Sequence, residues 1–497
     1  MANLKSLAKD TAIYGLSSIV GKFLNYLLVP LYTTAFAADS GEYGIVSQIY
    51  AFVALLQVLL ICGMETGFFR FANKEGENSQ LVYSSILISV GAISLAFLLF
   101  TLSFLTPIAS SLGYAEHPEF IGIMAIVVAL DVFQSIPFVY LRFKQRPVKF
   151  VFIKLFNILF GIGLNLFFLI ACPWLNTYYP ETIAWFYDPG YGVGYVFIAN
   201  LITSSVQMFF FIPELRGFVY KFDAALMKRI FTYSFPLLVL GVVGILNHTF
   251  DKMVLPSLFP NMEEGRVQLG IYSAATKIAM VMGMFTQAFR YAYEPFVFGK
   301  SRDSDQRMVY ANAMKFFVIF ALLAFLAVMF YLDILRYVIA IDYWEGLRVV
   351  PIVMAGEIFM GIYFNLSFWY KLIDETRWGA YFSLIGCAII VSLNVLFVPT
   401  YGYMASAWAG VVGYGVITII SYIVGQKKYP IRYELKEIGA YMLLAALLYT
   451  ISSLVCIDNI VLRLLFRTLL LALFIFYIIK KDLPLSQIPF LGRLIRK

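Results

Sequence analysis

The sequence predicts an all-α integral membrane protein with 14 transmembrane helices. Hydrophobic residues make up 61% of the 497 residues and charged residues 13%, whereas a soluble domain is about 45–50% apolar and about 25% charged. Apolar runs of bilayer length recur along the whole chain, and lysine and arginine gather in alternate loops. These features exclude a soluble enzyme, a nucleic-acid-binding protein and a disordered chain, and they leave no stretch for a soluble domain of usual size.

Polar residues divide the chain into fourteen apolar segments. Each is long enough to cross about 30 Å of hydrocarbon as a helix, whereas β-barrel strands would be about half as long and would alternate in polarity. We expect helices at residues 11–36, 43–63, 81–107, 120–140, 150–171, 194–212, 231–255, 269–289, 311–332, 347–370, 379–398, 404–424, 438–456 and 460–479.

The distribution of lysine and arginine predicts the orientation of these helices, because cytoplasmic loops of membrane proteins carry an excess of both. The N-terminus, the loops after even-numbered helices and the C-terminal tail hold 27 of these cations, whereas the opposite loops hold only Arg266 and Arg336. We therefore expect a multi-pass protein with an even number of spans and both termini in the cytoplasm. Four further cations near helix ends are interpreted mainly as interfacial: Lys315, Arg348, Arg463 and Arg467.

Two segments within the predicted helices read alike. Residues 163–166 (Gly-Leu-Asn-Leu) correspond to 392–395 (Ser-Leu-Asn-Val), and each segment leads to a Tyr-Gly pair, at Tyr191 and Tyr401, before the next helix. We infer that helices 1–6 and 7–12 are parallel copies of one unit, an arrangement that places a substrate path between the halves. Alternatively, the likeness reflects chance recurrence of small residues at helix–helix contacts.

The repeat predicts two six-helix lobes around a central cavity, followed by two extra C-terminal helices. The N-terminal lobe would hold helices 1–6 and the C-terminal lobe helices 7–12, and helices 13 and 14 would precede a basic cytoplasmic tail. The expected ranges are 1–213, 214–425 and 426–497.

Polar stripes within several helices mark faces that lipid cannot cover. At 100° per residue, Lys22 and Asn25 share a narrow arc of helix 1, and Lys154, Lys252 and Lys277 lie on comparable stripes of helices 5, 7 and 8. We predict that these five residues face the cavity and bind substrate, because lysine can hold an anion such as diphosphate as a point charge. The alternatives are a structural ion pair for Lys22, and snorkelling to the headgroups for Lys154 and Lys252.

Three acidic residues also fall within predicted spans, where a charge is costly unless it is paired or protonated: Asp131, Asp251 and Glu357. We regard them as candidates for coupling transport to H⁺ or Na⁺. Asp251 adjoins Lys252, so the two could instead form a structural ion pair. The four cysteines are scattered and neither histidine has a metal-ligating partner, so we expect no metal site, no cofactor and no catalytic residue.

Short motifs in a characteristic order link the chain to a known family. They are Lys-Asp-Thr-Ala-Ile-Tyr-Gly at 9–15 followed by Lys22, Glu-Tyr-Gly at 42–44, Arg-Pro at 146–147, Asp-Lys at 251–252, Gly-Ile-Tyr-Ser-Ala-Ala-Thr-Lys at 270–277, and Asn394 through Pro-Thr-Tyr-Gly at 399–402. In this order the chain resembles the Wzx-like polysaccharide-biosynthesis flippases of the multidrug/oligosaccharidyl-lipid/polysaccharide (MOP) exporter superfamily. The resemblance runs from end to end and includes the thirteenth and fourteenth helices.

The resemblance implies a function in the bacterial inner membrane. Such a protein would move an undecaprenyl-diphosphate-linked oligosaccharide from the cytoplasmic to the outer leaflet, for O-antigen (lipopolysaccharide), capsule or exopolysaccharide assembly. Its partners would be this lipid-linked substrate and membrane lipids, together with glycan polymerase and glycosyltransferases, and no nucleic acid. Among the quoted motifs, those that hold Lys22, Asp251, Lys252 and Lys277 would supply residues of the cavity.

Two other functions are compatible with a polytopic membrane protein. A cation-coupled multidrug exporter of the same superfamily usually has 12 helices and an acidic cavity, whereas this chain has 14 predicted helices and embedded lysines. A membrane glycosyltransferase or glycan polymerase usually has a large outer loop with catalytic carboxylates or arginines. The longest outer loop here, residues 172–193, carries no lysine or arginine.

Overall fold

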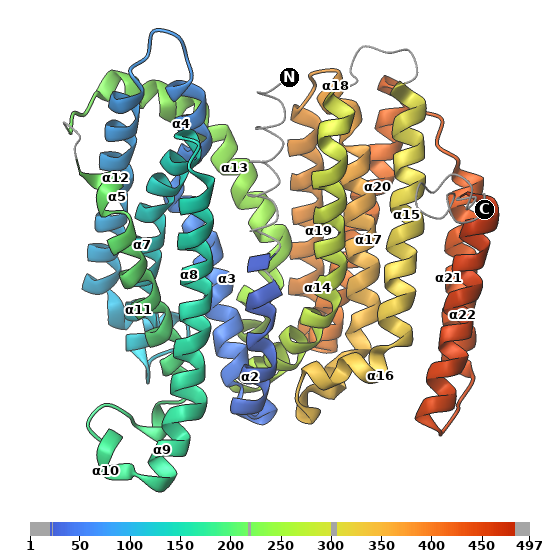
Figure 1. Cartoon of the computed structure of the whole chain (residues 1–497), viewed down its shortest axis with the longest axis horizontal. Helices are drawn as coiled ribbons and strands as arrows, with labels where there is room; N and C mark the ends of the chain where they lie inside the picture. The colour runs from blue at the N-terminus through green and yellow to red at the C-terminus, as the bar shows by residue number, and fades with distance from the viewer. Residues whose placement is uncertain (1–19, 22, 217–219, 300–305, 483–497) are drawn as a thin grey trace, which may run out of the picture. The chain divides into compact units, whose positions relative to one another are not determined.

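The described part of the chain forms helices joined by short connections. The computed structural model describes residues 20–21, 23–216, 220–299 and 306–482 (Figure 1). Contacts group the chain into two compact units: unit 1 is Met1–Ala274 with Val391–Ser406, and unit 2 is Ala275–Ile390 with Ala407–Lys497. The predicted lobe boundaries at 213 and 425 stay predictions.

Unit 1 holds the helices of the first half of the chain. Their bounds are α2 (Leu28–Ala35), α3 (Glu42–Ile61), α4 (Met64–Ala72), α5 (Ser79–Ser103), α6 (Leu105–Ser111), α7 (Pro118–Phe143), α8 (Pro147–Leu166), α9 (Cys172–Tyr178), α10 (Pro180–Ile183), α11 (Gly194–Phe210), α12 (Ile212–Leu215) and α13 (Ala224–Val254). α7 packs against α5 and α11, and α13 packs along α3 and α4. Within this unit, α4 and α12 lie at one end and α9 and α10 at the other (Figure 1).

Unit 2 holds the remaining helices, and three helices continue from one unit into the other. The helices that lie wholly in unit 2 are α15 (Gln306–Phe330), α16 (Leu332–Leu335), α17 (Val350–Leu366), α18 (Phe368–Leu372), α21 (Leu435–Leu454) and α22 (Ile460–Lys481). The helices that continue from one unit into the other are α14 (Met262–Gly299), α19 (Arg377–Tyr401) and α20 (Tyr403–Lys428). α15 packs against α17, α21 and α22, and α21 and α22 form an antiparallel pair (Figure 1). Trp369, Tyr370 and Phe382 are buried in an aromatic cluster of this unit.

Side chains with short polar groups begin several long helices. Asn78 at the start of α5 and Asn459 at the start of α22 each accept hydrogen bonds from two backbone N–H groups of the first turn. Asp223 caps α13 in the same way, which explains why this helix begins at Ala224 and not at residue 231 as predicted. Pro118 and Pro147 stand in the first turns of α7 and α8, where a missing N–H costs nothing.

Glycine permits a close approach between the start of α3 and the start of α14 in unit 1. A Cβ added to Gly44 would lie 2.0 Å from the backbone oxygen of Arg266. Nearby, Arg266 Nη2 donates a 2.7 Å hydrogen bond to the backbone oxygen of Gly113, and its guanidinium lies 4.5 Å from the ring centroid of Tyr114. One of the two cations predicted for the outer side therefore joins three segments of the chain.

The described helices agree with the predicted spans. Twelve of them are long and apolar enough to cross a membrane, and the shorter apolar helix Gly194–Phe210 stands at the sixth predicted span. α2 lies at the end of the first predicted span, residues 11–36, of which residues 11–19 and 22 are outside the described residues. Several spans are longer than predicted, and two of them run on through a further short helix. The second continues through α4 to Ala72, because Gly63 adopts a φ of 67° between α3 and α4, and the fifth continues through a π-helical turn (Phe167–Ala171) and α9 to Tyr178.

Candidate functional site

The predicted substrate-binding residues of helices 1 and 5 belong to unit 1. Lys22 lies outside the described residues, so its role stays a prediction, and Asn25 is exposed. Lys154 is half-buried in the second turn of α8, with its ammonium 5.8 Å from the ring centroid of Phe150. Its Cε lies 3.9 Å from where a Cβ on Gly21 would stand, so the lysine packs beside the first helix.

The carboxylate of Asp251, on the last turn of α13, has partners other than the neighbouring lysine. Tyr272 of α14 donates its hydroxyl to Asp251 Oδ2 at 2.8 Å, and the backbone N–H of Lys252 donates to Oδ1 at 2.8 Å. Among the described residues, no carboxylate lies within ion-pair distance of the Lys252 ammonium, whose side chain is half-buried. The alternative of an Asp251–Lys252 structural ion pair is therefore not the arrangement that the structure adopts.

Lys277 and Glu357 both lie in unit 2. Lys277 is half-buried on α14, and Glu357 is half-buried on α17. The Glu357 Oε2 atom lies 3.2 Å from the position of a Cβ on Gly283 of α14, so this glycine makes room for the carboxylate. The predicted substrate-binding and coupling roles of these two residues are not tested by this placement and stay predictions.

Asp131 of α7 is held by side chains of two other transmembrane helices of unit 1. Gln57 of α3 donates from Nε2 to Asp131 Oδ2 at 3.2 Å, and Ser204 of α11 donates from Oγ to Oδ1 at 2.8 Å. Both donors are neutral. A carboxylate in a span is costly unless it is paired or protonated, and the predicted coupling role of Asp131 stays a prediction.

The hydrogen bonds around Asp131 continue between α7 and α11. Gln134, fully buried on α7, donates from Nε2 to the backbone oxygen of Ser204 at 2.9 Å. Gln207 of α11 donates in turn from Nε2 to Gln134 Oε1 at 2.5 Å. Buried amides arranged in this way are satisfied by each other, so the pair fixes the register of the two helices around Asp131.

A second group of polar contacts lies between α2, α3, α8 and α11. Asn200 of α11 donates from Nδ2 to the hydroxyl of Tyr50 of α3 at 2.5 Å. The Tyr32 hydroxyl donates to Oδ1 of Asn165, which is 4% exposed, at 3.0 Å. Asn165 belongs to the repeated Gly-Leu-Asn-Leu segment. Its counterpart Asn394 is buried as well and accepts a 2.6 Å hydrogen bond from Ser406.

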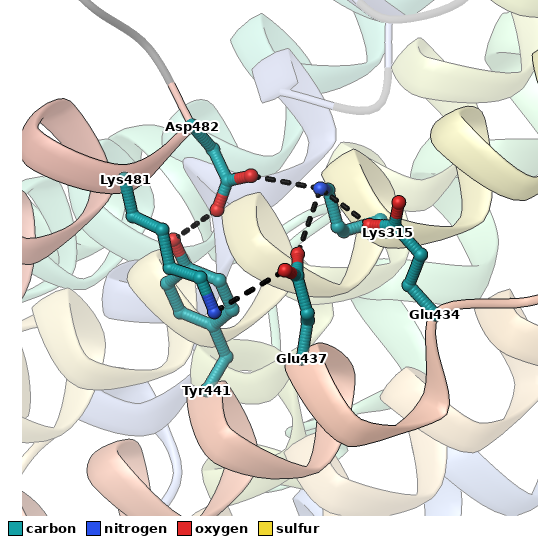
Figure 2. Close-up of polar contacts among 6 residues, drawn as sticks. All are labelled: Lys315, Glu434, Glu437, Tyr441, Lys481 and Asp482. Carbon is teal, nitrogen blue, oxygen red and sulfur yellow. Dashed lines mark hydrogen bonds and ion pairs between the residues drawn. The ribbon is translucent and has the colours of Figure 1, made fainter.

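Figure 2 shows a polar cluster in unit 2 that sequence reasoning missed. The Lys315 ammonium of α15 lies 2.5 Å from Glu434 Oε2, 2.9 Å from Glu437 Oε2 and 2.7 Å from Asp482 Oδ1. Sequence analysis interpreted Lys315 as an interfacial cation, but its side chain is only 10% exposed. The partners of Lys315 lie at the start of α21 and directly after α22, more than 100 residues away in the sequence, so no local sequence pattern could have predicted these ion pairs.

The same cluster fixes the carboxylate of Asp482. Tyr441 of α21 donates its hydroxyl to Asp482 Oδ2 at 2.5 Å, and Lys481 Nζ lies 3.5 Å from Glu437 Oε1 (Figure 2). Burial acts to raise the pKa of Asp482, but the hydrogen bonds from Lys315 and Tyr441 outweigh it and hold the pKa below its ordinary value.

A second ionic contact joins α22 to the other end of α15. Asp333, on α16 directly after α15, forms ion pairs through its Oδ2 atom with Arg463, whose Nε lies 2.7 Å away, and with Arg467, whose Nη1 donates a 2.8 Å hydrogen bond. Arg467 also donates to the backbone oxygen of Phe330 at 3.2 Å. The two arginines interpreted as interfacial are thus partners of α16 as well, and α22 is held near both ends of α15.

The described residues contain no group of three or more His, Cys, Asp or Glu side chains that could hold a metal ion. All four cysteines are free. The polar groups that the described spans contain are carboxylates, amides and ammonium groups.

Comparison with solved structures shows the fold that this chain shares with known proteins. The chain is similar to a lipid II flippase, "Lipid II flippase MurJ, inward closed conformation", with a TM-score of 0.73 and 17% identity over 95% of this chain and 99% of that chain. It is also similar to an inward-facing multidrug resistance MATE family transporter of the MOP superfamily, with a TM-score of 0.63 and 15% identity over 82% of this chain and 94% of that one. A MOP superfamily transporter from Pyrococcus furiosus gives a TM-score of 0.55 and 14% identity over 84% and 95%. The predicted all-α fold with about 14 transmembrane helices is confirmed.

The sequence profile of the family described as "Polysaccharide biosynthesis protein" matches residues 7–292, which is more than half of the chain. The protein therefore belongs to this family, as its motifs predicted. No curated protein sequence matches the chain.

Proposed function

We propose that the protein is a flippase for undecaprenyl-diphosphate-linked oligosaccharides. It would move them from the cytoplasmic to the outer leaflet of the bacterial inner membrane, where a glycan polymerase and glycosyltransferases build surface polysaccharide such as O-antigen, capsule or exopolysaccharide. Membership of the polysaccharide biosynthesis family supports this proposal, and so does a fold shared along 95% of the chain with a lipid II flippase. The protein would act by alternating access between two repeated halves and would perform no catalysis.

One contact carries the proposal for the substrate's charge. Because Tyr272 and a backbone N–H satisfy the Asp251 carboxylate, the Lys252 ammonium has no carboxylate partner among the described residues. A half-buried ammonium at the end of a span is costly without a counter-charge. A diphosphate supplies two negative groups, which lysine holds without demanding a fixed geometry. Lys22, Asn25, Lys154 and Lys277 would add further contacts to the head of the lipid.

Asp131 is the residue that we propose for coupling to H⁺. Its two donors, Gln57 and Ser204, come from α3 and α11, so protonation of Asp131 would change the hydrogen bonds between three helices of unit 1 at once. Asp251 and Glu357 are the other coupling candidates, for H⁺ or Na⁺.

The proposal is tested by measuring lipid translocation with the whole protein in proteoliposomes. The probe is undecaprenyl diphosphate that carries a short fluorescent oligosaccharide, and a membrane-impermeant quencher reports the leaflet in which the label lies. We expect labelled lipid to change leaflets only in vesicles that contain the protein, and Lys252→Gln to slow this movement. Equal rates in empty and protein-containing vesicles would count against a flippase.

A multidrug exporter is the alternative that the fold also permits. Cells that lack the gene would then become sensitive to cationic drugs, with no change in surface polysaccharide. If the proposal is correct, such cells instead accumulate lipid-linked oligosaccharide on the cytoplasmic side and keep their drug resistance.

A further inference from the structure

Three arginines stack on aromatic rings at one end of unit 1. The pairs are Arg70 of α4 with Tyr233 of α13, Arg142 of α7 with Phe69 of α4, and Arg229 of α13 with Phe71 of α4, and their guanidinium carbons lie 4.2, 5.1 and 5.5 Å from the ring centroids. On α4 the contributing residues are the consecutive Phe69, Arg70 and Phe71, and their partners come from α7 and α13. The three contacts therefore form one group. We call it the arginine group.

The arginine group lies close to the ends of apolar spans, where we expect lipid headgroups. The apolar spans end at Ala72 and Phe143, and the span of α13 begins at Ala224, so each arginine stands within two helical turns of a span boundary. This end is the one predicted from charge to face the cytoplasm. Arg70, Arg142 and Arg229 are exposed.

Positive charge exceeds negative charge in and around the arginine group. Glu77 pairs with Arg229 at 2.6 Å, Glu65 is the carboxylate whose charge interacts with Arg142, and Glu75 is exposed beside them. Lys74, whose ammonium lies 5.9 Å from the Phe71 ring, and the exposed Lys144 add further cations. Within the described residues, no carboxylate lies within ion-pair distance of Arg70.

Ring stacking prepares a guanidinium to bind an anion. A cation–π contact uses the flat face of the group and leaves the N–H groups of its edge available. The same edge matches two oxygens of a phosphate, and the ring beneath it restricts the rotation that binding would otherwise have to stop. Topology alone requires positive charge at this end, but it does not require arginines held by rings from neighbouring helices.

We propose that the arginine group binds the phosphate of a membrane lipid headgroup, with Arg70 at its centre. Basic residues between helices on the cytoplasmic side are a known way to hold anionic lipids. The proposal does not depend on the flippase function: the ligand's source is either an anionic phospholipid or the diphosphate of an undecaprenyl lipid, and both present the same phosphate oxygens.

Native mass spectrometry of the full-length protein tests this site, because it counts bound lipids on the intact chain and needs no transport. The probes are phosphatidylglycerol, undecaprenyl diphosphate and, as an uncharged control lipid, diacylglycerol. The variants are Arg70→Gln, Arg70→Lys and Tyr233→Leu. Arg377→Gln is the matched control, since Arg377, the first residue of α19 on the same predicted side, is 67% exposed and lies 4.0 Å from the carboxylate of Glu375.

We expect Arg70→Gln to weaken binding of a phosphate lipid roughly fivefold, the effect of one cation near the membrane surface. Arg70→Lys and Tyr233→Leu keep the charge but lose the stacked guanidinium, and should weaken binding by a smaller factor. Arg377→Gln and binding of diacylglycerol should not change. Weakening for both phosphate lipids, or for undecaprenyl diphosphate alone, supports the site and names its source. Wild-type binding by Arg70→Gln, or equal weakening by Arg377→Gln, would overturn it.

Discussion

The Lys315 ammonium lies 2.7 Å from Asp482 Oδ1, and this contact ties α15 to the residue that directly follows α22. The same ammonium reaches Glu434 and Glu437 at the start of α21 (Figure 2). At the other end of α15, Asp333 forms an ion pair with Arg463 and accepts a hydrogen bond from Arg467. The last two helices, which distinguish this chain from a 12-helix exporter, are therefore attached to α15 by ionic contacts near both of its ends.

Lys315→Met should destabilise the protein, because it leaves a carboxylate that is 8% exposed without its cation. Breaking a fully buried pair costs about 3–5 kcal/mol. The cost here should be lower, roughly 2–3 kcal/mol, because the Glu434 and Glu437 side chains are 44% and 35% exposed and are screened by solvent. Thermal unfolding in detergent measures the change. Lys428→Met, which removes a partner of the more accessible Glu375, is the control and should have little effect.

The depressed pKa of Asp482 predicts a pH dependence of stability. A carboxyl group whose pKa is lower in the folded protein contributes stability above its unfolded pKa, and this contribution is lost as the pH falls through the folded pKa. The direction of the shift places that loss at and below about pH 4. Asp482→Asn removes this contribution at every pH, so the difference in melting temperature between wild type and variant should be constant at neutral pH and shrink on acidification. A difference that grows in acid would contradict the assignment.

Gly44→Ala should weaken the contact between the starts of α3 and α14. The new Cβ would lie 2.0 Å from the backbone oxygen of Arg266, and backbone cannot rotate aside as a side chain can. Steric overlap of this kind costs about 1–3 kcal/mol, which a lower melting temperature would report. Gly163→Ala is the matched control, since a Cβ there meets nothing within 4 Å. An equal effect of both variants would mean that helix propensity decides, and not the Gly44–Arg266 contact.

The apolar segments predicted the helices well, because each helix that spans a bilayer needs a long apolar segment, and such a segment can be recognised from consecutive residues alone. Asp131 and Asn165 could likewise be recognised as polar residues in spans, but not their partners Ser204 and Tyr32, since these contacts join helices far apart in sequence. For the same reason Lys315 was interpreted as interfacial. Helix ends were less predictable, because caps such as Asp223 extend a helix beyond its apolar part.

Asp131→Asn should leave the fold intact and remove the proposed coupling to H⁺. An asparagine keeps an oxygen for the Ser204 hydroxyl, and the Gln57 amide can turn to accept from the new NH₂ group, so stability should change by less than about 1 kcal/mol. Lipid translocation in proteoliposomes should respond to an imposed pH gradient in the wild type and not in the variant. A variant that keeps the wild-type response to the gradient would exclude Asp131 as the coupling residue.

Tyr272→Phe tests whether the Lys252 ammonium is needed to bind the substrate, by making the neighbouring Asp251 carboxylate available to it as an alternative partner. Without the 2.8 Å hydrogen bond from Tyr272, Asp251 loses a side-chain donor, and its carboxylate becomes available to the adjacent ammonium. We expect Lys252 to turn toward Asp251 and translocation of undecaprenyl-diphosphate-linked oligosaccharide to slow, as in Lys252→Gln. The double variant Tyr272→Phe with Asp251→Asn removes the competing charge and should recover part of the rate. No recovery, with both variants still folded by size-exclusion chromatography, would show that the tyrosine acts on transport by another route.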